Sequence, residues 1–341
     1  NMENKDLMKL LDEVQEPGEG TPKEKRIILI DALNLFFRNF AVIGTLNSDG
    51  THVGGLGGFF RSLGALVRNL EADQVYVVFD GIGGSNNRKN LIPEYKSGRN
   101  TSRITNWEVF DSYEDEENSQ VDQIVRIAQY LKTLPVKTVA IDKVEADDVI
   151  AYVGEKLSHN KKNKVFIVSS DKDYLQLAKD NLIIYRPIEK RYYTPSTIKE
   201  KFGCPASNFI LYKLLMGDSS DKIEGVKGLG PKKLYKYFPE LQNEGLNLEG
   251  LLDIAEDKLK EHVIYARLLS DPYALKNKYK IMDLSKPMLD EKDIEYLDKF
   301  MEEPTPTFHP QIFLKLYNSD NLGNLIRNVD VWLKERFEKL V

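Results

Sequence analysis

Short apolar runs alternate with segments of helical spacing through the first 200 residues of the chain. Each run is apolar almost throughout, as in strands that are buried on both faces. The strand candidates are IILI (27–30), VYVVF (75–79), KTVAI (137–141) and VFIVS (165–169). The helix candidates are 33–42, 57–70, 121–134 and 144–157. This alternation predicts an α/β fold with a mostly parallel sheet flanked by helices.

The pattern divides the chain into three parts. Residues 1–25 read as an N-terminal appendage and linker, for which a docking helix and a disordered tail are both open. Residues 26–200 carry the α/β pattern, interrupted at 82–120 by a segment without sustained apolar periodicity, and segments of that length are usually functional or disordered. Residues 201–341 are helical in pattern, with a glycine-rich turn at about 217–238 and a charged helical tail.

Acidic side chains gather where the predicted strands end. The carboxyl ends of parallel strands meet in one crevice, which is where open α/β sheets bind ligands. Carboxylates crowded into a crevice repel each other, and cations among them remove that repulsion. Mg²⁺ or Mn²⁺ fits this need, because hard divalent cations prefer oxygen ligands. The nine candidate metal ligands are Asp31, Asp80, Glu145, Asp147, Asp148, Asp171, Asp173, Asp218 and Asp221.

The spacing of two acidic motifs is the most specific internal signal. VEADD (144–148) is followed, after 22 intervening residues, by DKD (171–173). On the predicted helix Glu145 and Asp148 share a face, whereas Asp147 points elsewhere, so we do not expect the three to bind one ion in the same manner. Two metals ~4 Å apart can activate a water and stabilise the leaving oxygen of a phosphoryl displacement. Helix caps and surface acids would explain any single residue, but they explain nine acids at successive crevice positions poorly.

The overall composition excludes several classes of protein. Hydrophobic content of 41% and charged content of 30% are typical of a globular protein in water. No apolar run approaches the ~20 residues that span a bilayer, and the acidic first residues do not read as a signal peptide. Cys204 is the single cysteine, so an internal disulfide is excluded and a reducing compartment is permitted. The four histidines lack zinc spacing. We therefore expect a cytoplasmic protein that does not bind membranes.

The net charge of −5 hides two basic segments. Residues 86–103 carry five basic residues against one acid, and so do residues 222–236, which gives each segment a net charge of +4. Two basic segments beside an acidic crevice suit a phosphate polymer better than a small anion. Either segment alone could equally be a solvated surface.

Two motifs in these segments suggest contacts with nucleic acid. In PEYKSGR (93–99), Lys96 could neutralise a scissile phosphate, although alone it would be an ordinary exposed lysine, and Tyr95 could stack a base or pack under the loop. GVKGLG (225–230) resembles a helix–hairpin–helix turn, in which glycines bring backbone N–H groups close to a phosphate, although any tight turn could use this pattern. The candidate DNA-backbone contacts are Gly225, Lys227, Gly228, Gly230, Lys232 and Lys233.

Together these motifs resemble those of the flap endonuclease and 5′–3′ exonuclease family, which includes bacteriophage 5′ nucleases and the 5′ nuclease domain of bacterial DNA polymerase I. IDALNLFFR, VVFDG, PEYKSGR, VEADD, SSDKD and GDSSDKIEGVKGLGPKK occur in the family's order over about residues 26–240. The resemblance implies a PIN-like core with a helical arch at about 82–120 and a helix–three-turn–helix element that binds DNA. The short leading helix, with no polymerase attached, looks more like the phage branch, for which the location would be the host cytoplasm.

The resemblance also implies roles for particular residues. Asp31, Asp80, Glu145, Asp147 and Asp148 match a first metal cluster, and Asp171, Asp173, Asp218 and Asp221 match a second, with Asp31 and Glu145 acting through water. Lys96 matches a catalytic lysine of the arch, and Arg88, Arg99 and Arg103 are looser matches. The implied cofactors are two Mg²⁺ ions, for which Mn²⁺ could substitute, and a K⁺ ion at the 225–230 turn.

We therefore predict a structure-specific 5′ nuclease that removes primers or flaps in replication, with DNA carrying a 5′ flap, nick or single-strand end as substrate. RNA–DNA hybrids and a single-strand-binding or replisome protein are further expected partners, and the chain is expected to be a monomer. The alternative is a non-catalytic protein that binds branched DNA, which the loss of acids would support, but none is lost. A toprim nuclease or primase also uses a glutamate and DxD, but its glutamate follows a strand, whereas Glu145 opens a helix.

Overall fold

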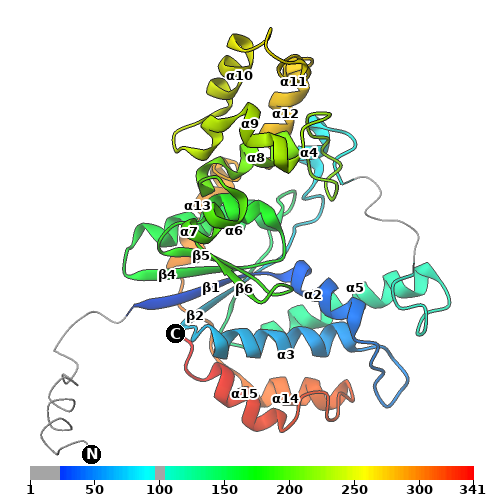
Figure 1. The fold of residues 1–341 in the computed structure, drawn as a ribbon. Coiled ribbons are helices and arrows are strands. Elements are labelled where there is room, and N and C mark those ends of the chain that lie inside the picture. Colours follow the sequence, from blue (N-terminus) through cyan, green and yellow to red (C-terminus); the bar gives the residue numbers. More distant parts are fainter. Residues whose placement is uncertain (1–23, 97–103) are drawn as a thin grey trace, which may run out of the picture.

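A six-stranded sheet lies at the centre of the molecule in the computed structural model, which describes residues 24–96 and 104–341 (Figure 1). The strands, in spatial order, are β3 (Lys137–Val139), β2 (Gln74–Val78), β1 (Lys25–Asp31), β4 (Asn163–Val168), β5 (Leu182–Arg186) and β6 (Arg191–Tyr193). All neighbours pair in parallel except β5 and β6, which are antiparallel. The predicted mostly parallel α/β fold is therefore confirmed. The pattern did not predict β5 and β6, which are short and lead into charged residues.

Helices cover both faces of the sheet and define two apolar layers. One face is covered by α2 (Ala32–Val42), α3 (Gly54–Asn69) and α5 (Tyr113–Leu131), whose Phe36, Phe59 and Ile127 are completely buried. The other face is covered by α6 (Ala146–His159), the 3-10 helix η1 (Lys172–Leu177) and α13 (Glu291–Glu302). The connections α7 (Pro195–Phe202) and η2 (Ala206–Asn208) follow β6 and lead out of the sheet.

A separate helical unit stands beyond one edge of this layered core (Figure 1). It contains α8 (Phe209–Met216), α9 (Pro231–Tyr237), η3 (Pro239–Gln242), α10 (Leu248–Asp257), α11 (Val263–Leu268) and α12 (Pro272–Met282). These helices enclose an apolar cluster of their own, which includes Leu211, Leu234 and Leu251. This unit carries the glycine-rich turn predicted at about 217–238.

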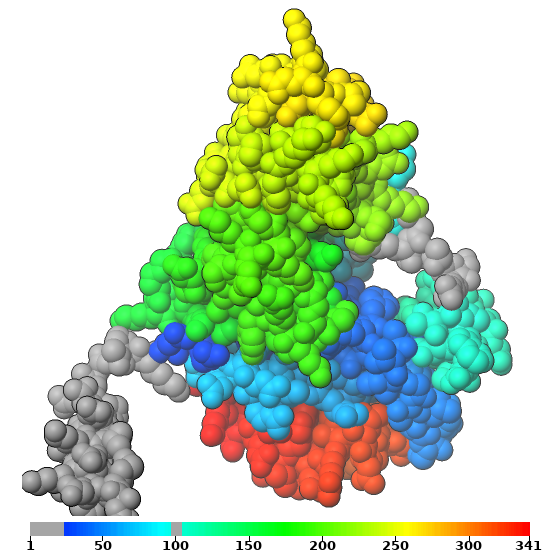
Figure 2. Space-filling view, viewed as in Figure 1, coloured from blue at the N-terminus to red at the C-terminus, as the bar shows by residue number. Residues whose placement is uncertain are grey.

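The C-terminal helices return to the core. α14 (Pro310–Ser319) and α15 (Val329–Phe337) pack below α3, and Figure 2 shows their surface adjoining that of α3. Close packing depends on two glycines of α3, because a Cβ atom would lie 2.1 Å from Leu325 at Gly57 and 2.4 Å from Trp332 at Gly64. The tail predicted from the sequence is thus part of the apolar layer that supports the sheet.

Two segments differ from the predicted boundaries. α5 begins at Tyr113 rather than at 121, because its first turns are acidic and offer no apolar period, while Ser112 caps them by accepting a hydrogen bond from the Asp115 N–H. α4 (Asn86–Leu91) lies inside the 82–120 segment, which has no sustained apolar periodicity and for which the family resemblance implied a helical arch. The N-terminal helix expected before residue 24 lies outside the described residues. No helix among those described combines the length and the apolar character that a membrane crossing requires.

Candidate functional site

An acidic cleft of about 430 Å³ opens where three parallel strands end. Asp31 is the last residue of β1, Asp80 follows β2, and Asp171 follows β4. Asp147, from the first turn of α6, completes the group of four carboxylates that line the cleft. The structure therefore brings together residues from four separate segments, as the positions of the acids predicted.

Asp31 has two roles at the floor of this cleft. It caps α2, because its side chain accepts a hydrogen bond from the Asn34 N–H, and its Oδ2 accepts from the Ser169 hydroxyl at 3.0 Å and the Tyr174 hydroxyl at 3.3 Å. Burial, followed by the charges of Asp80 and Asp171, raises the pKa of Asp31 to about 7. The helix-cap interpretation is thus correct but incomplete, because the same carboxyl group faces two others.

Asp147 carries an acceptor atom without a hydrogen-bond donor. Its Oδ1 is buried and has no hydrogen-bond partner among the described residues, although Arg88 Nη1 forms an ion pair with it at 3.6 Å. A buried carboxylate oxygen without a donor is costly, and a cation would satisfy it. Nearby, Asp80 Oδ1 accepts from the Ala146 N–H at 2.6 Å, which leaves its other oxygen toward the cleft. These residues fit a hard divalent cation with oxygen ligands.

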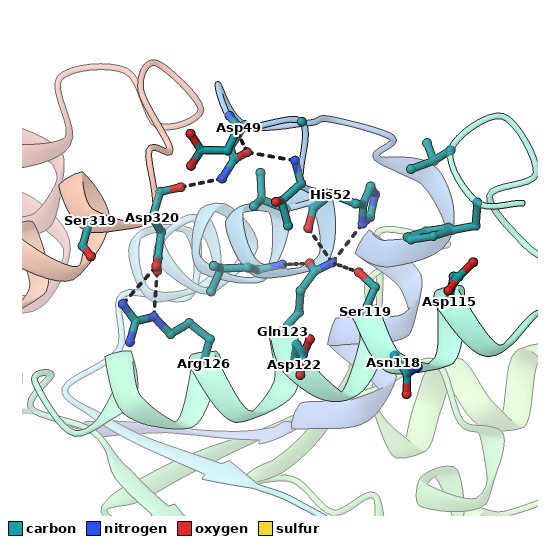
Figure 3. Close-up of a pocket in the computed structure, with 17 residues that line it drawn as sticks. Asp49, His52, Asp115, Asn118, Ser119, Asp122, Gln123, Arg126, Ser319 and Asp320 are labelled. Atoms are coloured by element: carbon teal, nitrogen blue, oxygen red, sulfur yellow. Dashed lines mark hydrogen bonds and ion pairs between the residues drawn. The ribbon is translucent and has the colours of Figure 1, made fainter. Parts of the chain in front are cut away.

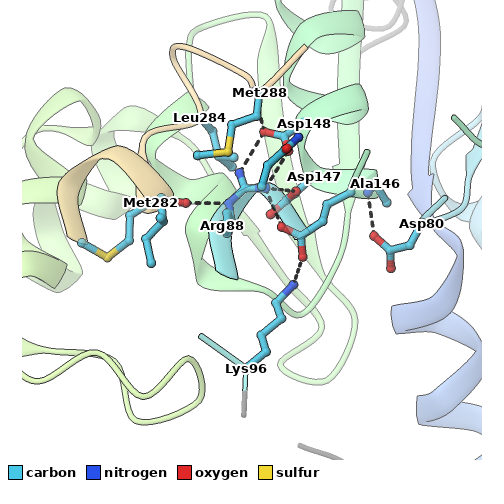
Figure 4. Close-up of polar contacts among 12 residues, drawn as sticks. Asp80, Arg88, Lys96, Ala146, Asp147, Asp148, Met282, Leu284 and Met288 are labelled. Atoms are coloured by element: carbon cyan, nitrogen blue, oxygen red, sulfur yellow. Dashed lines mark hydrogen bonds and ion pairs between the residues drawn. The ribbon is translucent and has the colours of Figure 1, made fainter. Parts of the chain in front are cut away.

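Arg88 holds the remaining acids of α6 from behind the cleft (Figure 4). Its guanidinium donates to Glu145 Oε2 at 2.5 Å, to both oxygens of Asp148 at 2.6 and 2.8 Å, and to the Ile281 carbonyl at 2.8 Å. Burial still raises the pKa of Asp148, although the hydrogen bonds and charge of Arg88 oppose it. With 1% of its surface exposed, Arg88 does not face the cleft, so its placement gives no support to the predicted contact with substrate.

One oxygen each of Glu145, Asp147 and Asp148 lie within 4.8 Å of one another. We expected Asp147 to point away from the other two, since it lies on another face of the helix. Glu145 is the N-cap residue of α6 in extended conformation, and this bend turns its side chain toward the first helical turn. The three acids are thus closer together than helical spacing led us to expect, but only Asp147 lines the cleft, whereas Arg88 binds Glu145 and Asp148. That the three do not bind one ion in the same manner stays a prediction.

A second acidic group forms around Lys213 of α8. One oxygen each of Asp173, Asp218 and Asp221 lie within 4.8 Å of one another, and the Lys213 ammonium pairs with Asp173 and with Asp218. Burial opposes ionisation of Asp218, but the charge of Lys213 and hydrogen bonds from Ser220 outweigh it and lower the Asp218 pKa to about 2. Lys213 was not singled out in the sequence, where it stands in an apolar helix without a motif.

Lys96 reaches the acidic cleft from the start of the arch segment. It lines the cleft and pairs with Glu145, so the structure places its ammonium beside the acids as predicted (Figure 4). Its neighbour Tyr95 is 4% exposed and packs into the apolar cluster of the helical unit, which favours the packing interpretation over base stacking. Arg99 and Arg103 lie outside the described residues. Arg38, the last residue of IDALNLFFR, and Tyr174, which follows SSDKD, also line the cleft, but neither was singled out from the sequence.

The glycine-rich turn presents lysines to solvent. Gly225 packs against the backbone of Gly217, where a Cβ atom would come within 2.6 Å of the Gly217 nitrogen, and Gly228 has a φ of 86° that favours glycine. Arg267 donates to the Lys227 carbonyl at 2.7 Å and fixes the turn. Gly230 then caps α9. The exposed side chains on this surface include the predicted Lys227, Lys232 and Lys233, and Glu224 is an exposed acid beside them.

A larger hollow of about 590 Å³ lies away from these acids, between the α2–α3 loop, α5 and the end of α14 (Figure 3). Its main polar groups bind one another: the Gln123 amide donates to His52 Nδ1 at 2.9 Å, and Arg126 holds both oxygens of Asp320 at 2.8 and 2.9 Å. The bond to His52 fastens the α2–α3 loop to α5, and the pair with Asp320 fastens the end of α14 to α5. Size alone therefore does not identify the functional site.

Comparison with known proteins agrees with the geometry of the cleft. A family described as "5'-3' exonuclease, N-terminal resolvase-like domain" matches residues 26–203. The 5'-3' exonuclease of Buchnera aphidicola is 32% identical over 232 residues, which cover 67% of this chain and 75% of that protein. DNA polymerase I of Bacillus subtilis is 30% identical over 70% of this chain, but only 26% of the polymerase is covered.

Solved structures confirm the fold. The T5 D15 protein co-crystallised with metal ions superposes with a TM-score of 0.64 at 22% identity, covering 86% of this chain and 99% of that chain. A bacteriophage T5 D15 flap endonuclease complex with DNA and metal ions gives a TM-score of 0.62 at 21% identity, covering 86% of this chain and all of that chain. The match of the family over residues 26–203, more than half of the chain, shows that the protein belongs to the 5′–3′ exonuclease family.

Proposed function

We propose that this chain hydrolyses phosphodiester bonds at the 5′ ends and 5′ flaps of branched DNA or RNA–DNA, leaving a 5′-phosphate and a 3′-hydroxyl. The observation that carries the proposal is the convergence of Asp31, Asp80, Asp147 and Asp171 in one cleft, with a buried Asp147 oxygen that lacks a donor. Membership of the 5′–3′ exonuclease family supports the same reaction.

Two groups of residues would hold divalent cations, Mg²⁺ or Mn²⁺. Asp31, Asp80 and Asp147 would hold one in the cleft, while Arg88 keeps Glu145 and Asp148 in place behind it. Asp173, Asp218 and Asp221 would hold the other. Asp171 lines the cleft with the first group and is two residues before Asp173 in the chain. Two such cations, when bound, activate the attacking water and stabilise charge on the leaving oxygen.

The chain's own side chains would position the scissile phosphate. The Lys96 ammonium, which lies at the cleft, would stabilise negative charge as it builds on that phosphate. The Tyr174 hydroxyl, whose pKa burial and the nearby carboxylates raise well above its usual value, stays protonated and donates to Asp31. Arg38, which also lines the cleft, would supply a second cation.

The helical unit would grip duplex DNA away from the cleft. The lysines of the 225–230 turn can contact phosphates without reading bases, and a K⁺ ion held by carbonyls of the turn would add positive charge there. A 5′ single strand would pass under or through the arch segment to the acids. The biological task would be primer or flap removal by a monomer in the cytoplasm, with a single-strand-binding or replisome protein as partner.

Substitution of one acid tests the proposal most directly. We expect Asp171→Asn to lower cleavage of a 5′-labelled flap at least ~100-fold, because charge stabilisation in a two-metal site is lost, while binding of the flap is retained. Asp142→Asn, a change of the same kind at an exposed acid outside the cleft, is the control and should cleave normally. Undiminished cleavage by Asp171→Asn would refute the assignment of the acids.

For the DNA-binding turn we expect the reverse result, in which binding weakens and the cleavage rate is retained. We expect the double variant Lys232→Ala and Lys233→Ala to weaken binding of a flap duplex and to reduce the slope of log K against log salt by about 1.8, since each phosphate contact contributes about 0.9. At saturating DNA its cleavage rate should be close to that of the unsubstituted protein. An unchanged salt dependence would place the duplex elsewhere.

A non-catalytic protein that binds branched DNA is the second candidate. The observation in its favour is that Arg88 and Lys213 already neutralise several of the acids. Protein that binds flaps but leaves them uncut with Mg²⁺ and with Mn²⁺ would establish it.

A further inference from the structure

A hollow of about 480 Å³ between α3 and α15 is lined by four arginines. Arg61 and Arg68 come from α3, Arg327 from the α14–α15 loop, and Arg336 from α15. The other lining residues are Ala65, Asn324, Leu325, Ile326 and Trp332, so none of the residues that line it is acidic. Four like charges around one hollow repel each other unless an anion lies among them.

The arginines are poorly neutralised by the protein itself. Among the residues that the structure describes, Arg61, Arg68 and Arg327 make no ion pair, and all three are exposed. Arg336 pairs with the exposed Glu335 at 3.4 Å, but its Nε is buried and has no hydrogen-bond partner. Arg61 and Arg68 are moreover the only charged residues of α3, a helix that otherwise consists of apolar residues, glycines, a serine and an asparagine.

The spacing of these groups suits a polymer of phosphates. Arg61 and Arg68 are seven residues apart on one helix, which separates them by about 10 Å along its axis. Successive phosphates of a duplex strand rise by about 3.4 Å, so this distance spans about three nucleotides. A single free phosphate could reach only part of the set. Trp332, which lies against α3 at Gly64, adds a partly exposed aromatic surface to the same hollow.

A contact between α2 and α3 connects the helix of the hollow to the helix that lines the candidate active site. Arg38 of α2 lines the acidic cleft, and its neighbour Asn39 accepts a hydrogen bond from Ser62, the neighbour of Arg61, at 3.1 Å. The hollow therefore lies on α3, the helix that packs against α2, at the seam with α15 that Figure 2 shows below α3.

We propose that the α3–α15 hollow binds the phosphodiester backbone of a nucleic-acid strand that extends beyond the cleft, as a second contact independent of the 225–230 turn. The inference rests on the proposed nuclease function. The four arginines meet no acid in the lining of the hollow and are spaced to reach several phosphates, which favours a nucleic acid over an acidic protein segment.

The test compares two DNA substrates in EDTA, where binding is measured without cleavage. One is a 5′-tailed hairpin duplex that ends at the junction, and the other carries a further duplex arm beyond it. We expect Arg61→Gln with Arg327→Gln to weaken binding of the two-armed DNA about tenfold and to reduce its salt slope by about 1.8, while binding of the one-armed DNA changes less than twofold. The control, Arg191→Gln with Lys292→Gln, removes two exposed charges from β6 and α13 and should affect neither DNA.

Three results would overturn the inference. The first is an equal loss of affinity for both DNA substrates, and the second is no loss of affinity for either. The third is an arginine-dependent affinity for polyglutamate that exceeds the affinity for the two-armed DNA, which would assign the hollow to an acidic protein. Cleavage of a flap with Mg²⁺ is measured on the same preparation. If the Arg61→Gln, Arg327→Gln variant cleaves normally and its binding is unaltered, only this inference is refuted. If the unsubstituted protein neither binds nor cuts the flap, the proposed nuclease function is refuted as well.

Discussion

The two groups of buried acids are neutralised in different ways. Behind the cleft, Arg88 is 1% exposed and is fixed by two carboxylates and the Ile281 carbonyl. In the second group, Lys213 reaches Asp173 and Asp218 with a single ammonium at the end of a flexible stem. A guanidinium bound in this way is part of the framework, whereas a lysine is a mobile point charge.

This difference implies that the two side chains behave differently when metal ions bind. Burial raises the pKa values of Glu145 and Asp148 in spite of Arg88, whereas Lys213 and Ser220 together hold the pKa of Asp218 at about 2 in spite of burial. We infer that Arg88 stays in place when cations bind, and that Lys213 is displaced by them. The comparison also suggests why Asp147, which no donor satisfies, is the acid of α6 that faces the cleft.

Removal of Arg88 should have the largest effect. Arg88→Met leaves Glu145 and Asp148 buried without their cation, and breaking a buried ion pair in this way costs about 3–5 kcal/mol. We expect a loss of this size in the free energy of unfolding, measured by urea denaturation in EDTA. Arg88→Lys is the matched variant: it keeps the charge but not the paired hydrogen bonds, so it should recover only part of the loss. A loss below ~1 kcal/mol for Arg88→Met would contradict a structural role.

The raised pKa of Asp31 predicts that the contribution of this residue to the stability of the protein changes with pH. Because the folded protein raises this pKa from 3.8 to about 7, its stability without metal should fall as the pH rises through this interval, where the unfolded chain has already ionised. The change corresponds to about 4 kcal/mol, and solvent in the open cleft should reduce it to about 2 kcal/mol. In EDTA at pH 8, Asp31→Asn should therefore stabilise the protein by about 2 kcal/mol.

At pH 4 the same substitution should have almost no effect, because Asp31 is then protonated in the folded protein. Thermal unfolding of the Asp31→Asn variant and of the unsubstituted protein at pH 8 and at pH 4 measures the change in stability at each pH. Asp49→Asn, at an exposed acid of the α2–α3 loop, is the control and should show no such dependence on pH. A stabilisation that is equal at both values would mean that the charge of Asp31 is not the cause.

The sequence predicts the structure correctly where a local apolar pattern marks a strand and acidic residues mark the end of that strand. Buried parallel strands are apolar runs, so four of the six strands and the acids at their ends could be predicted from the chain alone. The prediction failed where geometry depends on packing. The bend at Glu145 that gathers the acids of α6 is a property of the cap and not of helical spacing.

Residues that act through long-range contacts left no signal in the sequence. Lys213 stands in an otherwise apolar helix, and only the tertiary fold brings it to Asp173, 40 residues earlier. Arg88 looked like one more cation of a basic segment, but packing of α4 beside α12 buries it. The C-terminal helices were unassigned for the same reason, because their partners on α3 are more than 250 residues away in the chain.

Substitution of Lys213 should have the smallest of these effects, but it tests the difference between Arg88 and Lys213 most directly. If a cation must displace its ammonium from Asp173 and Asp218, Lys213→Met should bind Mn²⁺ about tenfold more tightly at the second group. Calorimetric titration of the metal-free protein measures this without any cleavage assay.

The acid sensitivity of the same variant provides an independent check. A folded pKa of about 2 for Asp218 stabilises the native protein above pH ~4, and this stabilisation is lost as the pH falls through 2. Lys213→Met removes the charge that lowers this pKa, so the variant should lose stability at pH values between about 4 and 2 less steeply than the unsubstituted protein. Weaker Mn²⁺ binding would show instead that Lys213 positions the carboxylates for the ion, and the two acidic groups would then be supported by their cations in the same way.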